Sequence, residues 1–354
     1  MAGEKTGTIQ AINLEPILDT SFPIGKLPPA VLASILTNAP QYDSRVLLGP
    51  GIGLDCAVVD AGDSFWVFKA EPITFATDQI GWYAVQVASN DIATTGAVPR
   101  FLLLTLLLPE GHTDEALARA ISQQLFSACE QHRITVLGGH TEVTHGIDRP
   151  LLAVTLIGEV ARDRLVTPRG AQPGDVLLLT KGIPIEATAL LAREFPQRMM
   201  THFSSQEIAE AANFLHQPGI SVLQDAQVAL AAGCVTAMHD PTEGGLSAAL
   251  WEMAQASGHD IRFDPSAVFI PPLSARICRY FGLDPYATIA SGALLLAVQA
   301  EDGNAILAAL QQNGITASRI GEVVPGSGKV FTKTGDRRSE WPYPQRDEIG
   351  KVYS

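Results

Sequence analysis

Acidic residues gather along one short stretch of this chain, residues 69–93, where three carboxylates lie within a span that ends in a helical pattern. Asp91 follows Ala84, Val87 and Ala88 by seven, four and three residues, so the helical period places its carboxylate among methyl groups. An unpaired charge on an apolar helix face is costly. We therefore expect either a network of hydrogen-bond donors or a divalent metal at Asp91, and the nearby acids favour the metal.

Carboxylates also stand at the ends of several predicted strands. A strand end or an apolar helix face is where a sheet delivers ligands to a shared crevice, and hard oxygen ligands suit magnesium bound together with phosphates. The alternative is that these acids are turn residues and that Asp91 is a core carboxylate bonded to the backbone. Four acids in this arrangement favour the metal: Asp55, Glu71, Asp91 and Glu142.

Two glycines, Gly138 and Gly139, follow a predicted buried strand at Ile134–Leu137. Glycine lets the backbone approach a ligand closely, and His140 and Glu142 would then point into the same space. A plain turn explains the glycine pair equally well. The chain has neither P-loop spacing nor a G-x-G-x-x-G after a strand, so the familiar nucleotide fingerprints are absent from the sequence.

The segment that begins at Asp240 has the pattern of a helix start, with Asp240 as the N-cap, proline in the first turn and Glu243 three residues after the cap. The predicted helix ends at Gly258. Gly244 and Gly245 would weaken its first turn by about 1 kcal/mol each, so we interpret them as clearing space for a ligand. The positive end of a helix suits a phosphate, and the two acids would then need a cation or a catalytic role.

Basic residues that could meet a phosphate are few. Lys69 and Lys181 are the preferred candidates, because each follows an apolar run and should emerge at a strand end. Lys26 lies in the N-terminal arm, where it could close over a bound phosphate. The full set of candidates is Lys26, Lys69, Arg100, Arg149, Lys181 and Arg276.

Composition excludes several classes of protein. The 354 residues are 46% hydrophobic and carry a formal net charge of −13, which argues against a nucleic-acid partner or an anionic membrane surface. The four cysteines contain no C-x-x-C pair, so a reducing cytoplasm is the expected location. No apolar run is long enough for a membrane span.

Hydrophobic periodicity predicts an α+β protein in two halves, separated by a polar hinge within residues 162–175. We expect a loosely attached arm at 1–30, a first domain at 31–165 and a second at 166–345. Strands are expected at 56–59, 65–68, 101–108, 134–137, 151–160, 176–180, 293–298 and 321–324, with helices ending near Gly96, His132 and Gly258.

Five motifs together resemble the superfamily of aminoimidazole ribonucleotide (AIR) synthetase, selenophosphate synthetase, thiamine-monophosphate kinase and the hydrogenase maturation factor HypE, and HypE is the nearest match. The resemblance runs from about Gly25 to Val324. The matching segments are Gly53–Val58, Asn90–Pro99, Gly138–Glu142, Pro173–Lys181 and Asp240–Gly245.

This resemblance implies a PurM-like fold, with N-terminal sheets that join two chains into a dimeric β-barrel and a C-terminal α/β sandwich domain. It implies ATP and Mg²⁺ in the cleft between the domains of a homodimer. The implied catalytic residues are Asp91, His140, Asp240 and Lys69, and the implied metal ligands are Asp55, Glu71, Asp91 and Asp240. The implied cofactor-binding residues are Asp55, Glu71, Asn90, Gly138, Gly139, Glu142, Lys181, Gly244 and Gly245.

The chain departs from HypE in having no cysteine after Cys278, so dehydration of its own C-terminal cysteine is not expected. The arm also lacks the cysteine or selenocysteine of selenium activation. We therefore expect an ATP-dependent enzyme that phosphorylates an amide, carboxyl-type or other oxygen of a separate small acceptor, which a protein partner could deliver. The alternative is a hydrogenase-maturation-related or regulatory nucleotide-binding homodimer without catalysis.

Overall fold

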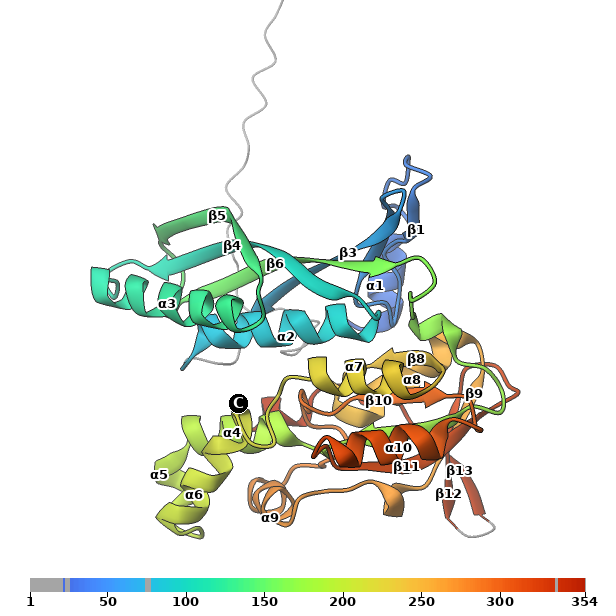
Figure 1. The fold of residues 1–354 in the computed structure, drawn as a ribbon. Helices are drawn as coiled ribbons and strands as arrows, with labels where there is room; N and C mark the ends of the chain where they lie inside the picture. Colours follow the sequence, from blue (N-terminus) through green and yellow to red (C-terminus); the bar gives the residue numbers. More distant parts are fainter. Residues whose placement is uncertain (1–21, 23–25, 74–77, 335–336, 354) are drawn as a thin grey trace, which may run out of the picture.

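Two α+β domains, each built on one sheet, make up the computed structural model (Figure 1). It describes residues 22, 26–73, 78–334 and 337–353, so the expected arm at 1–30 lies largely outside the described residues. In the described part of the chain, no helix is long and apolar enough to cross a membrane.

The first sheet has six strands in the order β1-β2-β3-β6-β4-β5. Only β4 and β5 run parallel to each other, while the other neighbours are antiparallel. The strand bounds are β1 (Val46–Leu48), β2 (Ala57–Asp60), β3 (Ser64–Ile73), β4 (Val98–Pro109), β5 (Thr135–Thr144) and β6 (Leu151–Ala161).

Two helices, α2 (Ile80–Thr94) and α3 (Glu115–Gln131), cover one face of this sheet. Buried Val67 and Leu102 belong to the core on that side, whereas Trp66 and Phe101 alternate with them and are exposed on the other face. In a single copy the sheet is therefore open, and no closed barrel forms within the described residues. The short helix α1 (Pro29–Leu36) precedes this sheet in the chain.

Strand β5 differs from the expectation of a buried strand followed by a turn. It runs on through Gly138 and Gly139 and forms an exposed edge. A Cβ on Gly139 would lie 1.9 Å from the carbonyl oxygen of Leu104, and both glycines have positive φ (144° and 152°). The glycines thus permit an irregular, very close pairing with β4, where the register shifts between Leu102 and Leu103.

The second sheet has seven strands in the order β13-β12-β9-β11-β7-β10-β8. Its strands are antiparallel except for the β12 and β9 pair. The bounds are β7 (Val176–Thr180), β8 (Val235–His239), β9 (Asp260–Phe263), β10 (Leu295–Val298), β11 (Ala317–Val324), β12 (Val330–Thr334) and β13 (Arg337–Glu340).

Helices sandwich the second sheet. Leu177 and Leu179 of β7 pack on the side of α8 (Gly245–Ser257), while Val176 and Leu178 belong to the core of α7 (Leu223–Ala232) and α10 (Gly303–Gln312). The remaining helices are α4 (Ile185–Glu194), α5 (Pro196–Met199), α6 (Ser205–Ala212) and α9 (Pro272–Phe281). Short 3₁₀ helices lie at Pro168–Gly170, Asn213–Leu215, Pro265–Ala267 and Glu348–Lys351.

The start of α8 corrects the expected capping by Asp240. The helix begins at Gly245, with Gly244 at the N-cap, because both glycines have positive φ (80° and 59°) and so break the helical conformation. The N–H of Gly244 donates to Asp347 Oδ2 at 2.6 Å. The expected C-terminus is confirmed, since Gly258 is the left-handed C-cap.

Candidate functional site

Strand β3 and helix α2 bring a lysine between two carboxylates. Lys69 and Glu71 lie two residues apart on β3, so both side chains leave the same face of the strand. The ammonium of Lys69 lies 3.0 Å from Glu71 Oε2 and 3.0 Å from Asp91 Oδ2. The expected burial of Asp91 on the apolar face of α2 is observed, and its partner is this lysine.

The second domain adds one carboxylate and one histidine from the end of β8. Ligand atoms of Asp55, His239 and Asp240 all lie within 4.8 Å of one another. Asp55 comes from the loop before β2 and the other two from the last residue of β8 and the next position, so both domains contribute. Residues far apart in the sequence therefore meet at the junction of the two domains.

Asp91 and Asp240 are held in an environment that disfavours their charged forms. Burial raises the pKa of Asp91 well above its usual value, and the carboxylates of Asp240, Asp55 and Glu71 add to this rise while Lys69 opposes it. Burial and the charge of Asp55 raise the pKa of Asp240 to about 7. Asp240 is fully buried, and neither of its carboxylate oxygens has a hydrogen-bond partner in the described structure.

His239 provides positive charge beside these acids. Burial alone would lower its pKa, but Asp55 and a hydrogen bond to Glu252 raise that pKa to about 9. Nε2 lies 2.8 Å from Glu252 Oε2, and Nδ1 lies 3.1 Å from the carbonyl oxygen of Asp240. Both ring nitrogens thus lie within hydrogen-bond distance of acceptor oxygens, so the protonated ring can pair with the acids around it.

A third cation, Lys26, comes from the segment before α1. Its ammonium lies 3.6 Å from Glu243 and 4.0 Å from Glu252. We define the acidic cluster as six carboxylates, Asp55, Glu71, Asp91, Asp240, Glu243 and Glu252, with the three cations Lys26, Lys69 and His239.

The acidic cluster has more carboxylates than cations. Ionised fully, it carries three negative charges in excess, and this repulsion adds to burial in raising the pKa of Asp91 and of Asp240. A divalent cation would relieve the repulsion. The oxygens of Asp55, Asp91 and Asp240 are the hard ligands that Mg²⁺ takes, and the buried unpartnered oxygens of Asp240 fit such an ion.

Helix α2 separates this cluster from a large groove. Tyr83, Val87 and Asp91 follow one another at four-residue steps on the face toward the cluster, and Tyr83 and Val87 line a small cleft there. Trp82 and Gln86 point instead into a groove of about 1010 Å³ on another face, together with Lys181 and residues 214–225.

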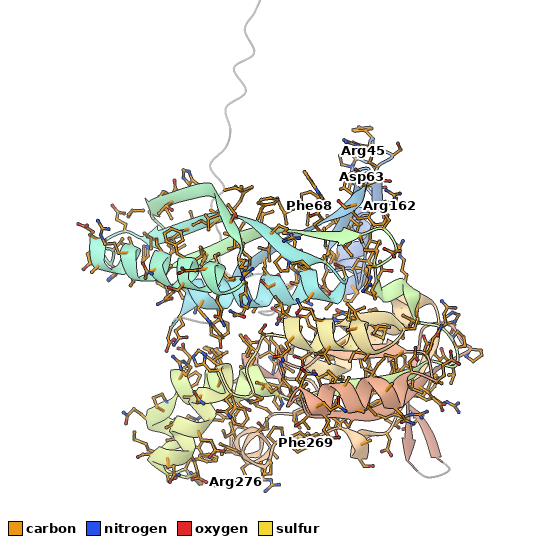
Figure 2. All side chains as sticks on the ribbon, viewed as in Figure 1. Arg45, Asp63, Phe68, Arg162, Phe269 and Arg276 are labelled. Atoms are coloured by element: carbon orange, nitrogen blue, oxygen red, sulfur yellow. The ribbon has the colours of Figure 1, made fainter. Side chains whose placement is uncertain are left out.

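Several predicted residues lie outside the acidic cluster in one copy. His140 and Glu142 pair with each other at 3.0 Å on exposed β5. Since β6 and β4 separate β5 from β3, three strand spacings, roughly 14 Å, lie between them and Glu71. Arg276 pairs with Glu207 on the side of the second domain away from the first (Figure 2). The predicted roles of Gly138, Gly139, His140 and Glu142 therefore stay predictions.

Lys181 and Asn90 both bind backbone groups of residues 219–222 instead of facing the cluster. The Lys181 ammonium lies 3.1 Å from Asp225 and donates to the carbonyl of Ser221 at 2.5 Å. The Asn90 side chain donates to the carbonyl of Ile220 and accepts from the N–H of Val222, which ties α2 to the second domain.

Sequence reasoning missed His239 and Glu252. His239 had a usable signal, because it follows the largely apolar run 235–238 and directly precedes Asp240. Glu252 lies seven residues after Gly245, two helical turns along the same face of α8, among apolar neighbours. A buried acid in an apolar helix is the same signal that identified Asp91.

Comparison with known proteins adds the family. Residues 53–160 match "AIR synthase related protein, N-terminal domain", and residues 172–333 match "AIR synthase related protein, C-terminal domain". A putative hydrogenase expression/formation protein of Methanocaldococcus jannaschii is 29% identical over 85% of this chain and 90% of its own. The carbamoyl dehydratase HypE of Cupriavidus necator is 30% identical over 75% of each chain.

Solved structures agree on the fold. HypE in complex with ATP superposes with a TM-score of 0.67 at 23% identity, covering 90% of this chain and 91% of that one. HypE in the HypE–HypF complex gives 0.71 at 19% identity, covering 90% and 100%. With both halves matched and the two-sheet architecture shared, the chain belongs to the AIR synthase related protein family.

Proposed function

We propose that this protein is an ATP-dependent, HypE-like enzyme that phosphorylates an oxygen of a small acceptor. The observation that carries the proposal is the acidic cluster at the junction of the domains, with the fully buried and unpartnered oxygens of Asp240 at its centre. A site with excess negative charge cannot attract a free triphosphate, but it can dock one that arrives with divalent cations.

Relatives and structural neighbours support the nucleotide. HypE has been solved in complex with ATP, and a thiamine-monophosphate kinase neighbour has been solved with AMPPCP and TMP. A selenide, water dikinase of Carboxydothermus hydrogenoformans is 27% identical over 92% of this chain and all of its own. These proteins bind or use nucleotides on the fold that this chain shares.

In the proposed reaction, Asp55, Asp91 and Asp240 would hold Mg²⁺, which would neutralise charge on the terminal phosphates when bound. Lys69 fixes Asp91 and Glu71 in position through its two ion pairs. The acceptor oxygen attacks the γ-phosphorus, the bond from that phosphorus to the β–γ bridging oxygen breaks, and ADP leaves. The acceptor oxygen, now a phosphate ester, can depart as phosphate in a later step.

We also propose a homodimer that closes the first sheet into a barrel. Trp66, Phe101 and Leu103 are 46%, 38% and 39% exposed on the side of the sheet opposite α2 and α3. Pairing this face with a second copy would bury it. A further protein partner that delivers the acceptor is consistent with the HypE–HypF complex of the structural neighbour.

Two measurements test the enzyme proposal. Mg²⁺ with ATP should raise the melting temperature of the purified protein, and ADP should be released in a single turnover when a suitable acceptor is added. Nucleotide stabilisation without turnover across a broad acceptor screen would support the alternative, a regulatory nucleotide-binding protein without catalysis. Failure of ATP and Mg²⁺ to stabilise the protein would contradict both functions.

A further inference from the structure

A large groove lies at the junction of the two domains, on the other side of α2 from the acidic cluster. Its volume is about 1010 Å³, and none of its lining residues belongs to that cluster. Helices α2 and α7 both contribute to the groove and lie side by side at the junction (Figure 1). Residues of α2, α3 and β4 line it from the first domain, and residues within 214–227 and 313–316 line it from the second. A ligand in this groove would therefore contact both domains.

The groove offers no unpaired charge. Lys181 and Asp225 are its only lysine, arginine or acidic lining residues among those described, and their charged atoms lie 3.1 Å apart. The Lys181 ammonium also donates to the carbonyl of Ser221. Burial lowers the pKa of His132, so this imidazole is neutral at physiological pH. A charged group on a ligand would lose its water here and gain no counter-charge, which favours an uncharged ligand.

Glutamine is concentrated in this groove. A primary amide offers two N–H donors and one carbonyl acceptor, so it binds polar groups of both kinds without charge. Gln224 and Gln227 are three residues apart on α7 and share one face of the helix, while Gln131 comes from α3 in the other domain. The 25 lining residues include five of the chain's 18 glutamines: Gln86, Gln131, Gln217, Gln224 and Gln227.

Most of these amides are available to a ligand. Gln86 is hydrogen-bonded to His132 at 3.0 Å. The side chains of the other four glutamines make no hydrogen bond to another described residue. The groove therefore presents hydrogen-bond donors and acceptors from both domains that only water or a ligand can satisfy.

Aromatic side chains lie among the amides. Trp82, Phe214 and Phe269 line the groove, and the Trp82 ring packs against His216 with 5.0 Å between the ring centroids. A polypeptide segment has matching chemistry, because each residue carries a peptide N–H, a C=O and a side chain. Sites for single small molecules measure about 300–1,000 Å³. A groove of about 1010 Å³ thus has space for several residues of an extended segment.

The backbone beneath the groove is fixed by the fold. Asn90 donates to the carbonyl of Ile220 at 2.7 Å and accepts from the N–H of Val222 at 2.8 Å, and Lys181 holds the carbonyl of Ser221. Residues 220–222 therefore need no ordering when a ligand binds, which lowers the entropic cost of binding.

We propose that this groove docks an extended, uncharged segment of a partner polypeptide. The glutamine amides bind the peptide N–H and C=O groups of the segment, and its apolar side chains pack against Trp82 and Phe214. The inference does not depend on the proposed ATP chemistry, because α2 separates the groove from the acidic cluster. A partner docked here would leave that cluster open to its own ligands.

A phage library of random octapeptides, selected on the full-length protein, tests the proposal. We expect the enriched peptides to contain few aspartates, glutamates, lysines and arginines. Synthetic capped copies of these peptides would be titrated by fluorescence anisotropy. Gln224→Ala and Gln227→Ala should each weaken binding about threefold to tenfold, because each removes a hydrogen-bonding amide. The double variant should weaken it more than either single change, and Trp82→Ala should also weaken it.

Gln206→Ala is the matched control, because Gln206 is an exposed glutamine on α6 that does not line the groove. Its affinity for the peptides should stay within twofold of the wild type. The proposal is overturned if no peptide is enriched, if the enriched peptides are rich in charge, or if the Gln224→Ala/Gln227→Ala variant binds them as the wild type does. Displacement of the peptides by maltohexaose or adenosine would assign the groove to a sugar or a nucleoside instead.

Discussion

Two lysines with little exposure, Lys69 and Lys181, both pair with aspartates, yet their surroundings differ. Lys181 has one carboxylate partner, Asp225, and its ammonium also donates hydrogen bonds to the carbonyls of Ser221 and Gly219. Lys69 stands between Glu71 and Asp91, in a cluster whose carboxylates outnumber its cations. One lysine is balanced by its neighbours, whereas the other is surrounded by surplus charge.

Charge balance therefore distinguishes a structural ion pair from a binding site in this protein. A balanced pair that also binds backbone carbonyls fixes loops, and residues 219–221 are held to β7 in this way. The acidic cluster, in contrast, leaves the carboxylate oxygens of Asp240 without a partner among the described residues. Such a cluster is suited to binding a cation together with a ligand. The lysines look equivalent in sequence, since each follows an apolar strand.

The largest expected effect is on turnover in the acidic cluster. Asp91→Asn should lower the single-turnover rate of ATP cleavage by about 10²–10³-fold, because it removes a charge placed toward the metal and phosphates. Its melting temperature without ligand should stay near that of the wild type, since Lys69 keeps Glu71 as its counter-charge and the repulsion of Asp91 from Asp240 and Asp55 is removed. Cleavage at the wild-type rate would contradict the role assigned to Asp91.

Mutation of the Lys181–Asp225 pair should instead lower the stability of the fold. Asp225→Asn leaves the Lys181 ammonium buried without its counter-charge, so we expect a loss of about 3 kcal/mol in the free energy of unfolding. Urea denaturation would measure it. Exposed Glu210→Gln, on α6, serves as the control and should have almost no effect. If Asp225→Asn is as stable as this control, the structural interpretation of Lys181 is wrong.

The pH dependence of stability should reveal Glu186. Its pKa is about 8 in the folded protein against 4.5 in the unfolded chain, so the folded state binds the extra proton. The resulting stabilisation is complete below pH 4.5 and is lost as the pH rises toward 8. Between pH 5 and pH 8 the wild type should lose about 3–4 kcal/mol more than Glu186→Gln, which has no such proton. If the wild type and Glu186→Gln lose the same free energy of unfolding between pH 5 and pH 8, this prediction is wrong.

The smallest effect is expected at the edge of the acidic cluster. Lys26 is 40% exposed and lies 3.6–4.0 Å from its partners, so Lys26→Ala should change the free energy of unfolding by less than about 1 kcal/mol. Its effect on ATP affinity should exceed its effect on stability if the residue meets phosphate. Titration and scanning calorimetry on the variant would measure the ATP affinity and the stability, respectively. A large loss of stability would mean that Lys26 has a structural role like that of Lys181.

The sequence was sufficient to predict the α+β class, most elements and the burial of Asp91, because these follow from local periodicity. It could not show that β5 is an exposed edge strand, since a strand's neighbours are decided by tertiary contacts. Nor could it show that Gly244 and Gly245 delay α8, because Gly245 is required by the close approach of the carbonyls of Thr288 and Tyr286.

The site, too, was predicted only where local sequence patterns place a residue, and not where tertiary packing does. Asp55, Glu71, Asp91 and Asp240 lie near one another, whereas Glu142, the fourth acid expected at the crevice, lies on edge strand β5. His239 and Glu252 enter only through the packing of β8 against α8. Lys181 had the sequence context of a strand-end cation, and only the fold reveals that Asp225 and the carbonyl groups occupy its ammonium.

The most direct test of the central claim is a calorimetric titration of ATP into the wild-type protein with Mg²⁺ and again with EDTA. The acidic cluster predicts binding in the first titration and a loss of at least a hundredfold in affinity in the second, because its surplus carboxylates repel free triphosphate. Asp240→Asn should weaken the Mg²⁺-dependent binding. Equal affinity with Mg²⁺ and with EDTA would contradict the claim that these carboxylates dock the nucleotide through a divalent cation.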